Sequence, residues 1–263
     1  MWLDSHCHLA ADEFNLDRTE VLDRAREAGV DAFIAIGSGY GIAGNARAVE
    51  MAASNPRVFA TVGVHPHEAK EFDDEARALL EELIGRPRVV AVGECGLDYH
   101  YMNSDREVQR SVFAEQAATA RTRKMPATIH VRGDEPNAYE ELLDIWLAET
   151  RREVEGVLHC YTGTLEFAQR AIAAGFYVSF SGILTFKNDR GLREVAKALP
   201  LERLMVETDA PLLAPQGFRG KRNEPAHVSA VGEMLASILE KPVEEVARIT
   251  SENARALFRL DDV

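Results

Sequence analysis

Short β-rich apolar runs alternate with longer amphipathic stretches from one end of the chain to the other. Eight of these runs have the length and the aliphatic and aromatic content of buried strands: residues 2–6, 31–36, 58–63, 89–94, 127–131, 156–159, 176–182 and 203–208. Helical periodicity marks residues 16–29, 105–124, 136–152, 166–175, 224–240 and 242–258. Glycine, a common residue just after a helix, stands at Gly29, Gly85 and Gly175.

This alternation of strands and helices predicts an α/β fold, a (β/α)8 barrel of the TIM type. An open doubly wound sheet is the alternative, but it usually carries a glycine-rich phosphate turn after its first strand. Here that position holds His6 and His8. The last two helical stretches are expected to close the outer ring of helices. We expect residues 1–263 to form a single domain.

The composition is that of an ordinary globular protein, with 46% hydrophobic and 28% charged residues. No apolar run reaches the roughly 20 residues that a membrane span needs, and the N-terminus lacks the basic and apolar regions of a signal peptide. Three cysteines in 263 residues indicate a reducing compartment rather than a disulfide framework. We therefore expect a cytoplasmic protein with no membrane association and no obligate protein partner.

The formal net charge of −13 argues against broad contact with duplex nucleic acid. It leaves room for a pocket that grips the end of a nucleic acid, where local charge matters more than the total. Bound divalent cations would also reverse the sign of the potential in such a pocket.

Titratable residues gather at the carboxyl ends of the predicted strands, the end at which barrel enzymes place their chemistry. His6 and His8 are one residue apart, so in an extended segment their side chains project to the same face. The later strand ends bring His65, Glu94, His130, His159 and Asp209. The sequence therefore predicts a metal site at the carboxyl ends of the strands.

Four imidazoles and two carboxylates from different strands can hold two divalent cations and leave positions open for water. A bridging carboxylate would keep the cations close together, and a water between them would lose a proton near neutral pH. The imidazole-rich set favours Zn or Mn over Mg, and the identity of the two metal ions (Zn, Mn or Mg) stays open. The expected metal ligands are His6, His8, Glu94, His130, His159 and Asp209.

The ordered motifs of the chain resemble the TatD family of metal-dependent deoxyribonucleases, within the amidohydrolase superfamily. The resemblance runs from Met1 to Phe258 through DSHCHL, VGVHPHEA, GECGLDYH, IHVRGD, LHCYTG, SGILTFKN, VETDAPLLAPQGFRGKRNEPAHV and NARALF. It implies a Mg²⁺-supported hydrolase that cleaves the phosphodiester bonds of DNA, expected to remove nucleotides from the 3′ end of single strands.

The same resemblance implies a role for each residue of the set. His6, His8 and Asp209 would hold the first metal ion. His130 and His159 would hold the second, and Glu94 would bridge the two. Glu94 and Asp209 would be the catalytic carboxylates, because Asp209 would also take the proton of the attacking water. His65 would bind the substrate phosphate instead of a metal ion.

Several cations are candidates for contact with the substrate. Arg219, Lys221 and Arg222 follow Asp209 closely in the sequence and are either a phosphate-facing patch or ordinary charges of a solvated loop. Arg132 follows His130 and either contacts the substrate or pairs with Asp134.

Other residues near the motifs have two interpretations. Cys7, Cys95 and Cys160 each follow a proposed ligand and would form either a thiolate site or part of the core. Alternation favours the core, because it turns the neighbour of an inward ligand outward, where cysteine packs as a small hydrophobe. Tyr161 and Phe186 would either stack on nucleobases or anchor loops. Glu207 would be either a partner of a metal ligand or a structural residue.

Two other functions compete with DNA cleavage. The same hydroxide could hydrolyse a non-phosphate ester or amide, for instance in D-aminoacyl-tRNA deacylation. Many amidohydrolases that this chain resembles bridge their two metal ions with a modified lysine. In this sequence Glu94 stands in the bridging position, which favours the nuclease. A metal-holding module without turnover is the third possibility, and the complete ligand set argues against it.

Overall fold

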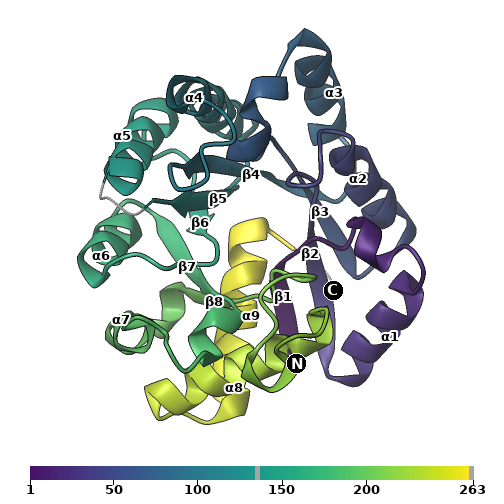
Figure 1. Ribbon diagram of the computed structural model, residues 1–263, viewed down its shortest axis with the longest axis vertical. Helices are drawn as coiled ribbons and strands as arrows, with labels where there is room; N and C mark the ends of the chain where they lie inside the picture. The colour runs from purple at the N-terminus through teal and green to yellow at the C-terminus, as the bar shows by residue number, and fades with distance from the viewer. Residues whose placement is uncertain (134–136, 261–263) are drawn as a thin grey trace.

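The computed structural model describes residues 1–133 and 137–260. Eight parallel strands lie in sequence order in one sheet, which curves into a nearly closed barrel (Figure 1). This confirms the predicted (β/α)8 architecture. The strands are β1 (Trp2–Cys7), β2 (Val30–Ile36), β3 (Val58–Val62), β4 (Val89–Asp98), β5 (Ala127–Arg132), β6 (Gly156–Leu158), β7 (Phe176–Phe180) and β8 (Leu204–Val206).

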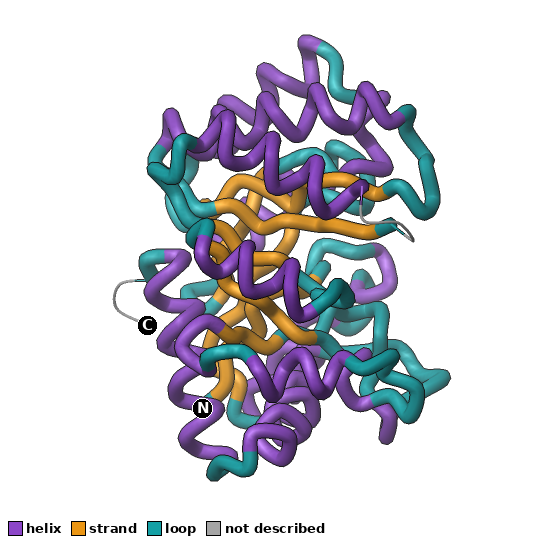
Figure 2. The backbone as a smooth tube through the Cα atoms, turned by 90° about the vertical axis from the view of Figure 1, so that its left-hand side faces the viewer, coloured by secondary structure: helices purple, strands orange, loops and turns teal. Residues whose placement is uncertain are grey.

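Helices α1 to α8 follow one another around the strands in Figure 1, and Figure 2 shows the strands enclosed by helices. Within the described residues, no helix is long and apolar enough to cross a bilayer. The α-helices are α1 (Arg18–Glu27), α2 (Gly44–Ser54), α3 (Asp74–Ile84), α4 (Arg106–Arg123), α5 (Asn137–Thr150), α6 (Leu165–Ala173), α7 (Leu192–Ala198), α8 (Val228–Leu239) and α9 (Val243–Phe258). Short 3-10 helices lie in the loops: η1 (Asp12–Phe14), η2 (Pro66–Glu71), η3 (Gly182–Thr185), η4 (Leu201–Arg203), η5 (Gln216–Phe218) and η6 (Pro225–His227).

Two of the helices, α2 and α7, were not among the predicted stretches. Helix α2 begins at Gly44 and is rich in alanine, and α7 has only 7 residues, so neither shows a long apolar stripe. Helix α3 was indicated only by Gly85 at its end. Gly29 and Gly175, two of the expected helix stops, adopt positive φ angles. This left-handed backbone conformation is common for the residue that follows an α-helix.

The last helix, α9, departs from the expected position in the outer ring. In Figure 1 it overlaps the strands, inside the ring of the other helices. Its Leu257 and Phe258 belong to the same buried cluster as the barrel residues Leu3, Ile34 and Met205. Helix α9 therefore closes the amino end of the barrel with apolar side chains and leaves the carboxyl end for polar chemistry.

Strand β1 contains an irregularity that turns His6 into the barrel. Leu3 belongs to the inner cluster, so strict alternation would also turn Ser5 and Cys7 inward and His6 outward. The register with β2 shifts between Asp4 and Cys7, and Cys7 instead joins the outer core under the helices. A bulge of this kind re-aims the following side chain, and so His6 and His8 both face the barrel interior.

Strand β4 contains a matching irregularity just before its functional carboxylate. Ala91 belongs to the inner cluster, and the register with β5 shifts between Gly93 and Cys95. Cys95 lies in the outer core, and Glu94 faces inward. The two strands that carry His6 and Glu94 thus use the same device at the same level of the barrel.

A buried carboxylate links β1 to the residues that follow β8 at the seam of the barrel. Asp4 accepts hydrogen bonds from the Thr208 amide at 2.9 Å and from the Thr208 hydroxyl at 2.6 Å. Burial raises the pKa of Asp4 to about 7. Beside this contact, the Asp209 amide donates to the His6 carbonyl at 2.9 Å. The seam therefore sets the position of Asp209 against His6.

We predict that Asp4→Ala lowers the free energy of unfolding by about 1–3 kcal/mol, because two buried Thr208 donors lose their acceptor. Denaturant unfolding measures the change. Asp23→Ala, which removes an exposed carboxylate of α1, is the matched control and should cost less than about 0.5 kcal/mol. Equal stability of Asp4→Ala and the parent protein would refute this account of the seam.

Candidate metal centre

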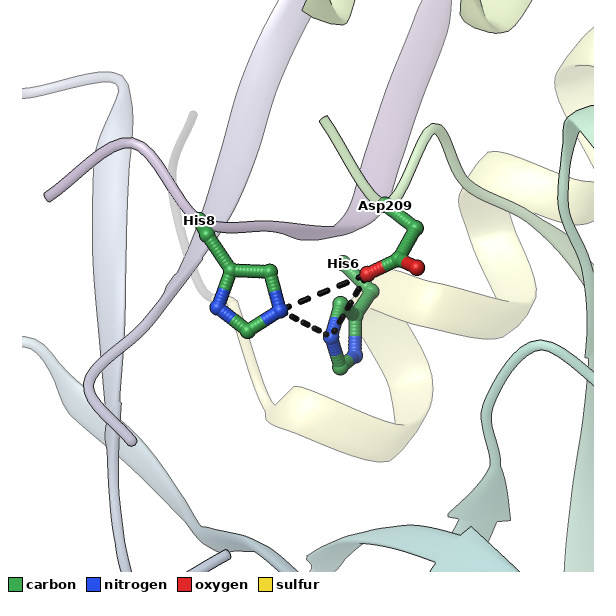
Figure 3. Close-up of side chains that lie close together, drawn as sticks. All are labelled: His6, His8 and Asp209. Carbon is green, nitrogen blue, oxygen red and sulfur yellow. Dashed lines mark hydrogen bonds and ion pairs between the residues drawn. The ribbon is translucent and has the colours of Figure 1, made fainter. Parts of the chain in front are cut away.

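His6, His8 and Asp209 converge at the carboxyl end of the barrel seam. Figure 3 shows two ring nitrogens and one carboxylate oxygen turned toward one another. The Nε2 atoms of His6 and His8 are 3.4 Å apart, and Asp209 Oδ1 lies 3.6 Å from the first and 3.3 Å from the second. These three side chains are grouped closely enough to hold one metal ion.

Glu94 lies between this group and the other histidines. Its Oε2 atom is 3.5 Å from His6 Nε2 and 3.8 Å from His8 Nε2. Its Oε1 atom is 2.7 Å from His159 Nε2 and 3.1 Å from His130 Nδ1. The two oxygens of one carboxylate therefore face two different pairs of imidazoles.

The charges of this cluster are buried, with Glu94 2% and Asp209 6% exposed. Burial raises the pKa of a carboxyl group, but the imidazoles of His159, His65 and His6 outweigh this and hold the pKa of Glu94 well below its usual range. The pKa of Asp209 is lowered too, because His8 and its neighbours outweigh burial. Both side chains are thus anionic near neutral pH.

The donor set fits divalent cations. Neighbouring imidazole nitrogens that face one another repel through their lone pairs unless a proton or a cation lies between them. Two buried carboxylates likewise need cationic partners. Imidazole nitrogens with carboxylate oxygens are the ligands that Zn, Mn and related ions take in proteins. The six predicted ligands are therefore brought together in an arrangement that metal ions would stabilise.

Buried carboxylates on the far side of two histidines fix which nitrogen each presents to the centre. Glu207 Oε1 lies 3.2 Å from His159 Nδ1, so the proton of a neutral ring stays on Nδ1 and Nε2 faces Glu94. Asp98 Oδ2 lies 3.0 Å from His130 Nε2, which leaves Nδ1 of that ring toward Glu94. Glu207 thus has the partner role that the sequence left open.

His65 differs from His130 and His159 in the nitrogen that faces the centre, which carries a proton instead of a lone pair. The His67 amide donates to His65 Nδ1 at 3.1 Å, so a neutral His65 carries its proton on Nε2. Burial lowers the pKa of His65 to about 4, which keeps the ring neutral. Its Nε2–H points toward Glu94 Oε1 at 3.5 Å. Although His65 lies close enough to Glu94 and His130 to share a metal ion, this tautomer makes it a hydrogen-bond donor.

Asp98, the last residue of β4, was missed by the sequence analysis. Its side chain is fully buried and accepts from His130 Nε2 and from His67 Nε2, at 3.0 and 2.9 Å. These donors outweigh burial and hold the pKa of Asp98 well below its usual range. Asp98 stands four residues after Glu94 and so shares its face of the strand, which is the signal that could have identified it.

The predicted cationic patch divides in two. Arg222 Nη2 lies 2.6 Å from Asp17 Oδ2 and 3.1 Å from Glu224 Oε1, contacts that favour a structural role for this arginine. Arg219 and Lys221 are exposed. The guanidinium of Arg219 lies 4.1 Å from the centre of the Phe186 ring.

Arg132 is exposed, with its guanidinium 4.7 Å above the ring of Tyr101. Its alternative partner, Asp134, lies outside the described residues. Tyr161 is 2% exposed and donates to the Thr164 carbonyl, so this tyrosine anchors a loop. Phe186 is half-buried beneath an arginine.

The cysteines lie mostly as expected, on the opposite face of the strand from the neighbouring predicted ligand. Cys7 and Cys95 are fully buried in the outer core, and burial raises the pKa of both thiols. Cys160 is only partly buried and lies 3.1 Å from the Ser181 hydroxyl.

Comparison with known protein families matches residues 3–259 to the family described as TatD related DNase. The chain belongs to the TatD family. It is 40% identical over 261 residues to the uncharacterized metal-dependent hydrolase YabD of Bacillus subtilis, covering 99% of this chain and 100% of that protein. It is 35% identical over 266 residues to the 3′-5′ ssDNA/RNA exonuclease TatD of Erwinia tasmaniensis, covering 98% and 99%.

Solved structures agree with this assignment. The TatD homolog YJJV of Escherichia coli superposes with a TM-score of 0.88 at 28% identity, covering 98% of each chain. The phosphotriesterase homology protein of Escherichia coli, at 16% identity, a TM-score of 0.71 and 98% coverage of each chain, shares the fold. As a TatD family member, the chain is a metal-dependent hydrolase that acts on ester bonds.

We predict that Asp98→Ala weakens metal binding about 10–100-fold, because His130 loses the acceptor that orients its ring. Titration with Mn²⁺ followed by calorimetry measures the affinity. Asp105→Ala is the control, since it removes an exposed carboxylate at the start of the helix that follows β4. Parent-like affinity in Asp98→Ala would show that the orientation of His130 does not depend on this contact.

Proposed function

We propose that the chain hydrolyses the phosphodiester bonds of DNA with two divalent metal ions, removing nucleotides from the 3′ ends of single strands. The observation that carries this proposal is the position of Glu94, whose two oxygens face two separate pairs of imidazoles. In this proposal His6, His8 and Asp209 would hold one ion, His130 and His159 would hold the other, and Glu94 would contribute a carboxylate oxygen to each. The metals, whether Zn, Mn or Mg, would supply a water nucleophile and polarise the phosphate.

Asp209 is proposed as the proton acceptor. Its carboxylate is anionic because the neighbouring imidazoles lower its pKa, and its Oδ1 atom faces His6 and His8 inside the site. The Asp209 backbone adopts a φ of 55°, an uncommon conformation for a residue with a side chain. The amide contact to the His6 carbonyl holds it there, so the acceptor is positioned before substrate arrives.

The substrate phosphate is proposed to meet His65 and the exposed cations of the rim. His65 offers an N–H donor within the site. Arg132, Arg219 and Lys221 offer positive charge around it in an acidic chain. A rim of this kind suits a single strand that enters end-first, because the remaining surface would repel a long duplex.

The family relationship supports this choice of substrate. The family is described as TatD related DNase, and the Erwinia relative is named a 3′-5′ ssDNA/RNA exonuclease. The family match over residues 3–259 also supports a single domain. The three cysteines are unpaired, which agrees with the reducing conditions of the cytoplasm.

We predict that metal-stripped protein resupplied with Mg²⁺, Mn²⁺ or Zn²⁺ shortens 5′-labelled single-stranded DNA in one-nucleotide steps. Asp209→Asn should lower the rate by about 100-fold or more, because the proton acceptor and one ligand charge are lost. Matched RNA and a D-aminoacyl-tRNA are run beside the DNA. If the DNA and the RNA stay intact while the acyl ester is cleaved, the function is deacylation and not phosphodiester cleavage.

His65→Ala separates phosphate contact from metal binding. We predict that it keeps the parent's metal stoichiometry and lowers kcat/KM on single-stranded DNA about 10–100-fold, through loss of one hydrogen bond to charged phosphate. His130→Ala, which removes a proposed ligand, is the comparison and should lose metal. Loss of one metal ion from His65→Ala would make His65 a ligand instead.

A further inference from the structure

Tyr101 is an exposed aromatic residue at the mouth of the barrel that the proposed mechanism leaves without a role. It lies in the loop between β4 and α4, and it is 53% exposed. Its amide donates to Asp98 Oδ1 at 2.9 Å, and Asp98 in turn contacts His130. The backbone of Tyr101 is therefore anchored to the residue that orients a proposed metal ligand.

The Tyr101 ring is also held from several directions. The ring of His67 meets it at 88° with 5.5 Å between centroids, and the ring of His100 meets it at 85° with 4.7 Å. The guanidinium of Arg132 lies 4.7 Å from the ring centre. A half-exposed ring fixed by its backbone and by three side chains offers a flat apolar surface with little entropy left to lose.

Flat aromatic surfaces beside a cation are what single-stranded nucleic acids bind. An unpaired base stacks on the ring or on the guanidinium plane, and the arginine reaches the adjacent phosphate. The rim carries a second pair of this kind on the β7–β8 side, where Arg219 covers Phe186. Bases inside a duplex have both faces covered by their neighbours and cannot stack on such surfaces.

We propose that Tyr101 and Arg132 form a subsite that stacks one unpaired nucleobase of the substrate. This rests on the proposed function and deepens it, since it makes the enzyme selective for strands whose bases are free. The subsite acts through binding of the base, apart from the phosphate chemistry at Glu94 and Asp209.

The test combines Tyr101 variants with abasic substrates. Steady-state kinetics are measured on a 5′-labelled single strand in which one abasic nucleotide is placed at each position near the 3′ end in turn. Tyr101→Ala should lower kcat/KM about tenfold on the intact strand, mainly through KM, and Tyr101→Phe should restore it. At one position the abasic nucleotide should lower kcat/KM of the parent protein by a similar factor. At that position it should not lower kcat/KM of Tyr101→Ala any further.

Matched controls separate this subsite from a structural effect. Arg132→Ala should behave like Tyr101→Ala, whereas Arg203→Ala, which disrupts the arginine–aromatic stack of Arg203 on Tyr177, should not. A small phosphodiester without bases, methyl p-nitrophenyl phosphate, should be cleaved equally by the parent and by Tyr101→Ala.

Each other outcome overturns a definite statement. If Tyr101→Ala loses as much activity on the small phosphodiester as on DNA, Tyr101 acts only by supporting Asp98. If Tyr101→Ala cleaves DNA with the parent's kinetics, the proposed subsite is refuted and the proposed function is unaffected. A parent protein that cleaves the small phosphodiester but neither DNA nor RNA would refute the proposed function, and the subsite with it.

Discussion

The centre of this molecule is organised around one buried carboxylate. Glu94 lies at the middle of the carboxyl end of the barrel, where an isolated charge would be strongly unfavourable. Imidazoles that come from β5 and from the ends of β1, β3 and β6 surround it. A (β/α)8 barrel is suited to this arrangement, because its strands deliver side chains from all directions to one point. Cations bound by these groups would neutralise the buried negative charges of Glu94 and Asp209.

The barrel reaches this arrangement by breaking its own regularity at two strands. Uninterrupted alternation would put Cys7 and Cys95 inside and His6 and Glu94 outside. Bulges of this kind lengthen one strand locally and release backbone groups from the ladder. At the seam with β8 the carboxylate of Asp4 accepts from the amide and the hydroxyl of Thr208. Closure of the barrel and placement of the ligands are thus solved by the same few residues.

Much of this could be predicted from sequence, for physical reasons. Buried parallel strands are continuous apolar runs, and their carboxyl ends meet, so His6, Glu94 and Asp209 could be placed in one mouth without knowing any contact. Bulges have no such pattern, and the correct inward direction of His6 followed from its pairing with His8. The amphipathic stripe of α9 showed that it buries one face but not which surface receives it. Whether Arg222 faces phosphate or Asp17 depends on residues some 200 positions away in the chain.

The histidines of the centre show how identical side chains acquire different chemistry from their far-side partners. A carboxylate behind the ring, as at His130 and His159, accepts a hydrogen bond from the ring N–H and leaves the lone pair of the other nitrogen for a cation. An amide behind the ring, as at His65, donates a hydrogen bond to one ring nitrogen and leaves the N–H of the other nitrogen for the substrate. Asp98 adds a further consequence, because it also fixes the amide of Tyr101. The carboxylate of Asp98, at the end of β4, therefore orients the predicted ligand His130 and also positions the rim loop that carries Tyr101.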